Sequence, residues 1–261
     1  MRPSTHLLLA TSTTLLVSSS YAFVIPQDEV DVLAALAVNE SQALPDCSTI
    51  TSCVPSQGAA HIIVSRASTE PAGTGVLGAV ADAVVAACPG SDIVANPYPA
   101  LLSPYLPSEP YGVGNLTELV TTYQACCPHS KIVLMGYSQG AQVTADFLCG
   151  TSEVGFPATP AYAASVKDSL AAAVIMGDPT FVKGLPWDRG NASNVSYFPR
   201  QDNGACKPVA PVFISYCDSG DLYCDDGTAA DALSIHTGYV TKYGAQAGNY
   251  TVDKIGGCPG A

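Results

Sequence analysis

Positively charged side chains are scarce in this chain. Of its 261 residues only 10 are Lys or Arg, against 22 Asp or Glu, so the formal net charge is −12. A basic surface is what draws a protein to the phosphates of nucleic acids or to an anionic membrane. The composition therefore argues against nucleic acid and membrane partners. It is compatible with a neutral polymer.

Charge of either sign is also sparse, at 12% of residues, whereas 48% are hydrophobic. A disordered chain has the opposite balance, so we expect a globular protein. The sequence also lacks internal repeats and low-complexity linkers. Its length without a leader suits one domain with a sizeable core.

Long hydrophobic runs are missing apart from a short one at the start. Residues 1–22 combine a brief basic beginning, an apolar stretch and small side chains at Ser20 and Ala22, the pattern of a secretory signal peptide cut after Ala22. This run is too short and too polar for a membrane anchor, and the C-terminus lacks the apolar tail of a lipid-anchor signal. We expect a secreted, extracellular protein with an N-terminal extension or pro-segment at residues 23–46 and a domain at residues 47–261.

The sequence has no tight Cys/His spacing of the kind that zinc needs. We therefore expect no metal site, and we expect no cofactor. Ten cysteines, an even number, indicate disulfides in an exported protein. Sequons make five residues candidates for glycosylation: Asn39, Asn115, Asn191, Asn194 and Asn249.

Short apolar stretches alternate with helix-like segments along the chain. The predicted strands are residues 61–66, 91–96, 131–135, 170–176 and 212–216. The predicted helices are residues 28–37, 76–87, 116–125, 141–148 and 162–168, with a last helix starting near His236. Residues 97–111 are expected to be a loop, and residues 180–210 an irregular stretch. Such alternation predicts an α/β fold, a three-layer sandwich around a mostly parallel five-stranded sheet.

Residues 131–140 contain a motif with a candidate catalytic residue. An apolar, β-branched run ends in the sequence G-Y-S-Q-G at residues 136–140, and a helix-like segment follows. In a nucleophile elbow a serine stands exposed in a strained turn between a strand and a helix. The positions two before and two after it must be nearly without side chains. The pattern predicts Ser138 as a nucleophile; the alternative is a glycine-rich turn with an incidental serine.

A serine hydroxyl needs a base to take its proton, and the usual base is a histidine held by a carboxylate. In elbow enzymes the order along the chain is serine, acid, histidine, and only His236 follows Ser138. His61 and His129 each come at the start of a predicted strand, at the amino edge of the sheet, whereas chemistry in open parallel sheets lies at the carboxyl edge. His236 is therefore the predicted base.

The sequence offers several acids for this histidine. Asp221 lies between Cys217 and Cys224, and a disulfide across that short loop would hold its carboxylate rigidly. Asp178, at the end of a predicted strand, is the second candidate, and either aspartate could instead be a turn residue. The other aspartates downstream of the elbow and near the carboxyl edge are Asp218, Asp225, Asp226 and Asp231.

A tetrahedral intermediate also needs hydrogen-bond donors for its oxyanion. In elbow enzymes one donor is the backbone N–H of the residue after the nucleophile, here Gln139. The second comes from the loop after an early strand, here residues 67–69, where Ser68 offers both an N–H and a hydroxyl. The alternative for Ser68 is an ordinary turn or helix N-cap.

Together these sequences resemble the fungal cutinase and acetylxylan esterase family, carbohydrate esterase family five, over residues 50–256. The resemblance is carried by R-A-S-T-E at 66–70, G-Y-S-Q-G at 136–140, M-G-D-P at 176–179, S-Y-C-D-S-G-D-L-Y-C at 215–224 and H-T-G-Y-V-T-K-Y-G at 236–244. It implies an α/β-hydrolase fold without a lid, hence an open site suited to polymers.

The resemblance also implies a role for each site residue. It gives Ser138 as nucleophile, Asp221 as acid and His236 as base, with Ser68 and Gln139 as the oxyanion donors. Ala67 departs from the family, which often has Gly or Glu at this position.

Three disulfides follow from the resemblance as well. They are Cys217–Cys224, Cys149–Cys206, and a bond from Cys53 to Cys126 or Cys127, with Cys127 preferred because it precedes Pro128. The resemblance gives no partner for Cys47, Cys88, Cys258 or the remaining cysteine of the 126–127 pair.

The implied activity is that of a secreted serine carboxylic ester hydrolase that works through an acyl-enzyme. We expect it to deacetylate a plant cell-wall polysaccharide such as xylan, since the tyrosine-rich residues 97–111 suit sugars. One alternative is a cutinase acting on the longer acyl esters of cutin. Others are a peptidase and a non-catalytic wall protein on the same fold. The expected partner is an ester-bearing polymer or a small ester, and the expected state is a monomer.

Overall fold

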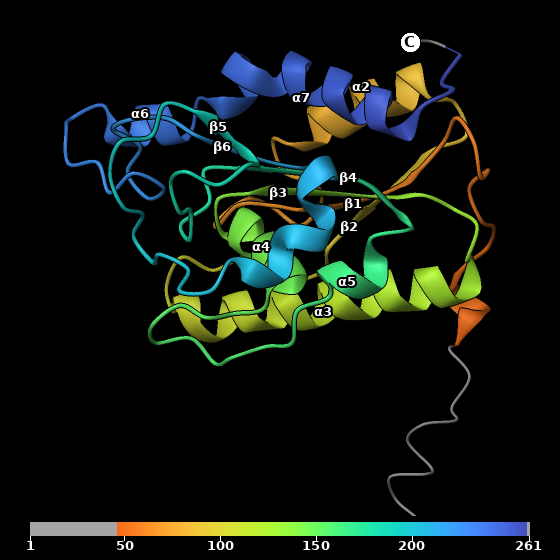
Figure 1. Ribbon diagram of the computed structural model, residues 1–261, viewed down its shortest axis with the longest axis horizontal. Helices are drawn as coiled ribbons and strands as arrows, with labels where there is room; N and C mark the ends of the chain where they lie inside the picture. Colours follow the sequence, from red (N-terminus) through yellow and green to blue (C-terminus); the bar gives the residue numbers. More distant parts are fainter. Residues whose placement is uncertain (1–45, 260–261) are drawn as a thin grey trace, which may run out of the picture. The chain divides into compact units, whose positions relative to one another are not determined.

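The structure, a computed structural model, describes residues 46–259. Their strands form a single parallel sheet in the order β2-β1-β3-β4-β6-β5 (Figure 1). The strands are β1 (His61–Ser65), β2 (Asp92–Ala95), β3 (Ile132–Tyr137), β4 (Leu170–Met176), β5 (Asp188–Gly190) and β6 (Phe213–Cys217). The predicted signal peptide, the helix expected at residues 28–37 and Asn39 lie outside the described residues.

Helices cover both faces of the sheet. The α-helices are α2 (Gly78–Ala87), α3 (Tyr105–Cys126), α4 (Gln139–Cys149), α5 (Ala163–Val166), α6 (Ala232–His236) and α7 (Tyr239–Ile255), with 3-10 helices η1 (Cys47–Thr49) and η2 (Gly204–Val212). Figure 1 shows α2 and α7 together on one face, and α3, α4 and α5 on the other. The predicted α/β sandwich of three layers is therefore confirmed.

The central strands are apolar along their whole length because both of their faces are buried. In β1, Ile62 and Val64 pack under α2 and α7, whereas Ile63 packs toward α3 and α4. In β3, Leu134 and Met135 divide in the same way. Alternate side chains of each strand thus belong to two separate hydrophobic cores, one on each side of the sheet.

The predicted number of strands was wrong: the sheet has six, not five. The additional strand is β5, which pairs with β6 at the edge of the sheet. Its three residues are polar or glycine and largely exposed. The sequence therefore has no apolar run at this position that would predict a strand. The stretch expected to be irregular, residues 180–210, contains this strand.

The expected boundary of α3 was also wrong. A loop was predicted through residue 111, but the helix begins at Tyr105. Leu106 has a non-helical backbone, which kinks the helix, and Pro107 and Pro110 lie in the first turn of the continuous part that follows. Proline is tolerated in the first turn of a helix, where the backbone N–H has no acceptor within the helix. The sequence pattern alone suggested a break instead.

Five disulfides join the ten cysteines. They are Cys47–Cys126, Cys53–Cys127, Cys88–Cys258, Cys149–Cys206 and Cys217–Cys224. The structure thus contains the pairs that the resemblance implied, including the preferred partner of Cys53. It also joins the cysteines that were left without a partner.

The candidate glycosylation sites differ in their surroundings. Asn191, Asn194 and Asn249 are exposed. Asn115 lies in α3 and its side-chain nitrogen donates to the Pro97 carbonyl at 2.9 Å. The side-chain nitrogen of Asn194 donates to the buried Asp225 carboxylate at 3.3 Å. A glycan bonds to this nitrogen, so Asn191 and Asn249 are the sites we predict to be modified.

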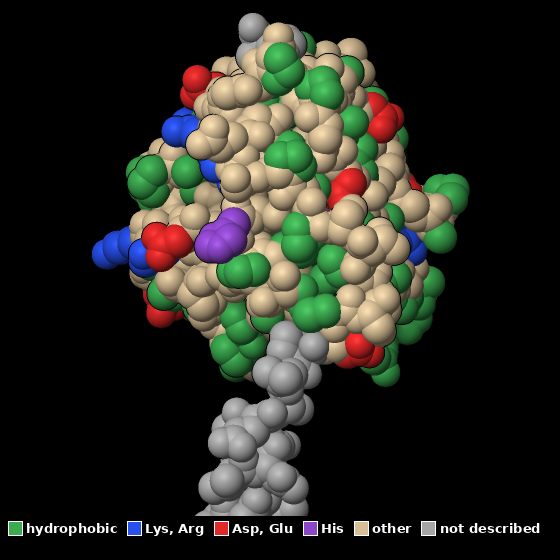
Figure 2. Space-filling view, turned by 90° about the vertical axis from the view of Figure 1, so that its right-hand side faces the viewer, with side chains coloured by type: hydrophobic (Ala, Val, Ile, Leu, Met, Phe, Trp, Pro, Cys, Tyr) green, Lys and Arg blue, Asp and Glu red, His purple; other side chains and the backbone are tan. Residues whose placement is uncertain are grey.

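The surface at the end of α3 is mixed in character. Figure 2 shows hydrophobic and charged side chains interspersed on this face, without one continuous hydrophobic area. Among residues 46–259, none of the helices has the length and apolar character needed to cross a membrane.

Candidate active site

Ser138 lies in the sharp turn between β3 and α4. Its backbone is strained, with φ 53° and ψ −117°. A Cβ atom added to Gly136 would come within 2.3 Å of the Gly140 carbonyl oxygen, and one added to Gly140 within 2.0 Å of the Ser65 carbonyl oxygen. Neither position can hold a side chain without moving the backbone, so the local geometry is that of a nucleophile elbow.

The structure brings Ser138, His236 and Asp221 together from three segments. The Nε2 atom of His236 lies 2.9 Å from Ser138 Oγ, and its Nδ1 atom lies 2.9 Å from Asp221 Oδ2. His236 is the last residue of the short helix α6 and precedes α7, which begins at Tyr239 rather than at the predicted position. All three side chains are at least nine-tenths buried.

The loop that carries Asp221 holds its carboxylate in place. Asp221 Oδ1 accepts hydrogen bonds from the backbone N–H groups of Tyr223 (2.7 Å) and Cys224 (2.8 Å), and the Cys217–Cys224 disulfide closes the loop. Burial disfavours the charged carboxylate, but the hydrogen bonds from His236 and these amides outweigh it, so the pKa of Asp221 lies below its ordinary value of 3.8.

An ionised carboxylate can only accept hydrogen bonds. The Nδ1 atom of His236 must therefore carry the proton that it shares with Asp221. This leaves Nε2 of the neutral imidazole free to accept from the Ser138 hydroxyl. The geometry thus matches a serine with a base beside it and an acid that fixes the tautomer of that base.

The other candidate acids bind different partners. Asp178 accepts from the Thr180 N–H at 2.8 Å and from its hydroxyl at 2.7 Å. Asp218 accepts from Lys242 at 2.6 Å and from Tyr243 at 2.7 Å. Asp225 anchors the backbone N–H groups of residues 193 and 194. Asp226 and Asp231 are exposed.

The remaining histidines lie at the other edge of the sheet. His61 is the first residue of β1, its Nδ1 atom is 2.6 Å from Asp92 Oδ1, and its ring stacks on Tyr123 with centroids 3.7 Å apart. His129 is exposed in the turn before β3. Neither belongs to the arrangement around Ser138.

Ser68 lies in the loop after β1, beside Ser138. Its hydroxyl oxygen is buried and has no hydrogen-bond partner within residues 46–259. Glu70 shapes this loop, because its two carboxylate oxygens each accept a backbone N–H at 2.7 Å, from Ala67 and Val76. A buried hydroxyl without a partner is costly, and Ser68 and Ser138 line the same hollows.

Gln139 is the first residue of α4. Its side chain accepts from the Ser108 hydroxyl at 3.0 Å and donates to the Leu101 carbonyl at 2.9 Å. These bonds tie the start of α4 to the first turns of α3 and to the loop before it. The backbone N–H groups of the first turn of a helix point away from its body, toward the side where the nucleophile stands.

Two hollows meet at Ser138. The catalytic hollow has a volume of about 260 Å³, and its lining includes Ser68, Val76, Leu102, Leu233 and His236. The aromatic hollow has a volume of about 310 Å³, and its lining includes Tyr105, Pro179, Tyr197, Phe198 and Tyr223. Ser68, Leu102, Ser138 and Tyr223 line both.

A third hollow, of about 450 Å³, lies between η1, the start of β1 and α3. Its lining includes His61 and Asp92 but no residue near Ser138. Its larger size does not outweigh the geometry around Ser138, because catalysis requires a nucleophile and base in contact.

Several residues that shape the site were not predicted. The Tyr137 hydroxyl donates to the His236 carbonyl at 2.5 Å, and the ring of Tyr223 meets the imidazole edge-to-face at 4.7 Å. A Cβ atom at Gly177 would lie 2.8 Å from His236 Cε1. The sequence signal for Gly177 was its place in M-G-D-P after a strand; nothing local marks the two tyrosines.

Among the described residues, no group of three or more His, Cys, Asp or Glu side chains is arranged to hold a metal ion. The chemistry derived for this site uses the side chains and backbone of the chain itself.

The chain is similar to known proteins over most of its length. A family model described as Cutinase matches residues 56–255. Acetylxylan esterase 2 of Talaromyces purpureogenus is 33% identical over 208 residues, which are 76% of this chain and 87% of that protein. Cutinase 11 of Verticillium dahliae is 31% identical over 211 residues, 76% of this chain and 70% of that protein.

The same similarity extends to solved structures. An acetylxylan esterase determined at 0.90 Å superimposes with a TM-score of 0.70 and 33% sequence identity. The match covers 78% of this chain and 100% of that one.

Proposed function

This chain belongs to the cutinase family and is a serine esterase, and we propose that it deacetylates a plant cell-wall polysaccharide through an acyl-enzyme on Ser138. The observation that carries the mechanism is the line of two 2.9 Å contacts from Ser138 through His236 to Asp221. We propose these three residues as nucleophile, base and acid.

In the first step Ser138 Oγ attacks the ester carbonyl carbon while its proton passes to His236 Nε2. The C–O bond to the alcohol then breaks, and the imidazolium returns that proton to the leaving oxygen. Asp221 stabilises the imidazolium without taking its proton. The sugar hydroxyl leaves, and the acyl group stays on Ser138 as an ester.

In the second step water repeats the attack on the acyl-enzyme. His236 Nε2 accepts a proton from the water, and the resulting tetrahedral intermediate releases Ser138 Oγ, which regains a proton from the imidazolium. The products are the carboxylic acid and the free enzyme. We propose that the Gln139 N–H and the N–H and hydroxyl of Ser68 bind the oxyanion in both steps.

Two observations support a short acyl group on a sugar. The first is the similarity to acetylxylan esterase 2. The second is the wall of the aromatic hollow, to which Tyr105, Tyr197 and Tyr223 contribute. Tyrosine rings provide flat apolar faces with a hydroxyl at one end, and we propose that a sugar ring packs against them.

A cutinase activity is the second candidate, and the rim of the catalytic hollow favours it. Val76, Leu102 and Leu233 are 50–55% exposed and surround the entrance. Exposed apolar side chains around a site suit an apolar substrate.

A chain-length series separates these candidates. We expect the highest kcat/KM on nitrophenyl acetate, a decline for butyrate and longer esters, and release of acetate from acetylated xylan. Highest kcat/KM on long acyl esters, with release of monomers from cutin, would replace the acetyl proposal by the cutinase one.

A non-catalytic wall protein on this fold is tested by Ser138 itself. We expect a fluorophosphonate to label Ser138 and Ser138→Ala to lose at least about 10³-fold in kcat. Unchanged hydrolysis by Ser138→Ala would reject the serine mechanism.

We propose in addition that the protein is secreted after removal of residues 1–22 and acts as a monomer. N-terminal sequencing and size-exclusion chromatography of the protein exported by a fungal host test these proposals. A mature chain that starts near residue 47 would identify residues 23–46 as a pro-segment.

A further inference from the structure

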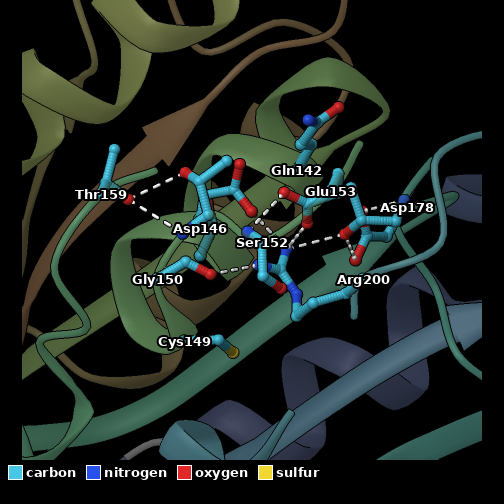
Figure 3. Close-up of polar contacts among 12 residues, drawn as sticks. Gln142, Asp146, Cys149, Gly150, Ser152, Glu153, Thr159, Asp178 and Arg200 are labelled. Atoms are coloured by element: carbon cyan, nitrogen blue, oxygen red, sulfur yellow. Dashed lines mark hydrogen bonds and ion pairs between the residues drawn. The ribbon is translucent and has the colours of Figure 1, made fainter. Parts of the chain in front are cut away.

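Arg200 is buried beside the active site and binds several elements at once. Its Nη1 atom donates to the Gly150 carbonyl at 2.7 Å. Its Nη2 atom lies 2.9 Å from Glu153 Oε1, donates to the Thr180 hydroxyl at 2.8 Å, and contacts Asp146 Oδ1. Figure 3 shows the side chains of Asp146, Glu153 and Arg200 converging.

Four buried carboxyl groups surround this single guanidinium. They are Glu109 of α3, Asp146 of α4, Glu153 of the loop after α4, and Asp178 at the end of β4, and each is at most 4% exposed. We refer to them with Arg200 as the Arg200 cluster. The proposed mechanism uses none of its members.

The Arg200 cluster lies behind the wall of the aromatic hollow. Pro179 and Phe198 line this hollow, and each is within two residues of a cluster member. Two backbone hydrogen bonds join their segments: Phe198 N–H to the Pro179 carbonyl at 2.8 Å and Arg200 N–H to the Thr180 carbonyl at 3.2 Å. Tyr105 completes this part of the wall, with its ring 5.7 Å from that of Phe198.

We propose that Arg200 is a positioning residue for substrate binding. By holding Asp146, Glu153 and Thr180 together, it fixes the wall of the aromatic hollow against Ser138. These contacts of Arg200 weaken as the surrounding carboxyl groups lose their protons. The inference rests on the proposed esterase function.

The charge balance explains why protons matter here. One guanidinium cannot neutralise four carboxylates, and a buried charge without a partner is strongly disfavoured. Burial raises the pKa of Asp178 to about 6 and that of Glu153 to about 8, although Arg200 opposes both shifts. Burial and then the neighbouring Asp146 raise the pKa of Glu109 to about 10.

The other titratable groups facing the Arg200 cluster add no positive charge. They are the phenols of Tyr105 and Tyr98, whose pKa values burial raises, so both stay neutral. Arg66 lies beyond Tyr98, with its guanidinium carbon 5.1 Å from the centre of that ring. Each proton lost above neutral pH therefore adds a negative charge that Arg200 alone must balance.

This arrangement predicts that KM changes before kcat as the pH rises. Repulsion among the carboxylates loosens the segments that carry Pro179 and Phe198, so the substrate binds less well. Asp221 and His236 come from a different loop and from α6, and their contacts do not involve the Arg200 cluster. Once the substrate is bound, turnover continues.

The test compares the same change at a buried and at an exposed glutamate. Glu153→Gln replaces the carboxyl group beside Arg200, whose pKa of about 8 lies inside the measured range, by an amide that cannot lose a proton. Glu118→Gln makes the same change at an exposed position of α3. We measure KM and kcat for nitrophenyl acetate from about pH 6 to about pH 9.5, with the spontaneous hydrolysis subtracted.

In the wild type and in Glu118→Gln we expect KM to rise about five-fold or more over this range while kcat stays within about two-fold. In Glu153→Gln we expect the rise in KM to fall below about two-fold, because the carboxyl group with a pKa of about 8 is gone. A flat KM in the wild type, or the same profile in both variants, would overturn the proposal. Absence of hydrolysis at every pH would reject the esterase function instead.

A second variant tests Arg200 directly. Arg200→Lys keeps the charge but cannot bind Gly150, Glu153 and Thr180 at once, because an ammonium lacks the planar fork. At about pH 6 we expect KM to rise about ten-fold with kcat within about three-fold. An equal loss in kcat with unchanged KM would contradict a role in binding. If this variant does not fold, the comparison of Glu153→Gln with Glu118→Gln still decides.

Discussion

At the scale of single residues, Ser68 differs from the other polar side chains of the site. Its hydroxyl is buried beside Ser138 without a hydrogen-bond partner in residues 46–259. In contrast, His236 Nδ1 is hydrogen-bonded to the carboxylate of Asp221. Leaving such a group unpaired costs stability. We propose that this cost is recovered when an oxyanion forms next to the hydroxyl, so that Ser68 acts mainly in the transition state.

Ser68→Ala should therefore lower kcat far more than it changes KM. The loss of one oxyanion donor typically costs about 10²-fold to 10³-fold in kcat. Steady-state kinetics on nitrophenyl acetate measures both constants, and Ser68→Thr, which keeps a hydroxyl, is the matched control. If Ser68→Ala retains wild-type kcat, the hydroxyl is not a donor and only backbone groups serve the oxyanion.

The two aspartates that the sequence left open should separate clearly. Asp221→Asn should lower kcat about 10⁴-fold, because an amide can no longer fix the donor tautomer of His236. Asp178→Asn should lower kcat less than about ten-fold, because Asp178 bonds Thr180 and not the imidazole. Steady-state kinetics of both variants at one pH tests this prediction. If Asp221→Asn and Asp178→Asn lose kcat to a similar extent, the hydrogen bond to His236 does not identify the catalytic acid.

At the scale of elements, the site is assembled from three turns at the carboxyl edge of one sheet. The elbow follows β3, the Ser68 loop follows β1, and the Asp221 loop follows β6. Parallel strands deliver these turns to the same edge, although they are far apart along the chain. The Cys217–Cys224 disulfide then closes the Asp221 loop.

Two of the disulfides should differ in role: Cys217–Cys224 should matter mainly for activity and Cys88–Cys258 mainly for stability. In the chain-entropy account a bond that closes a longer loop stabilises more: about 5 kcal/mol for Cys88–Cys258, with a separation of 170, and about 2 kcal/mol for Cys217–Cys224, with a separation of 7. Replacing the first pair by Ala should mainly lower Tm, and replacing the second should mainly lower kcat.

Calorimetry and kinetics on the two double variants measure these effects. The matched control is the Cys149–Cys206 pair, with a separation of 57, for which we expect an intermediate loss of stability. A Cys217–Cys224 variant with unchanged kcat would show that the hydrogen bonds to Asp221 suffice without the bridge.

At the scale of the whole molecule, buried acids set the pH at which the fold is most stable. Asp221 has a pKa below its ordinary 3.8, so the stability it contributes is present above that value and is lost as the pH falls. Asp178 and Glu153 have raised pKa values of about 6 and about 8. The native state holds their protons more tightly than the unfolded chain, so their contribution is lost as the pH rises through those values.

These opposite dependences predict greatest stability on the acid side of neutrality. We expect Tm to fall by at least about 5 °C between about pH 6 and about pH 9. A series of thermal melts across pH measures this. Glu153→Gln removes one of the titrating groups and should make the decline shallower, and a Tm that rises with pH over this interval would contradict the prediction.

The sequence by itself determined the local features. The spacing of Gly136 and Gly140 around Ser138 follows from steric contact within one turn, and the order of serine and histidine reduced the candidate bases to His236. The apolar strands predicted a parallel sheet with helices on both faces, because a strand that is buried on both faces has apolar side chains at consecutive positions. The elbow pattern also predicted Gln139 as an oxyanion donor and left Ser68 open between a donor and a turn residue. The pairing of Cys53 depended on resemblance to a known family.

Only the tertiary structure decided what depends on distant partners. It joined Cys88 to Cys258 and Cys47 to Cys126, added the polar edge strand β5, and began α3 among its prolines. It also gathered Glu109, Asp146, Glu153 and Asp178 around Arg200. These outcomes arise from contacts between segments far apart in the chain, and such contacts leave no pattern in neighbouring residues.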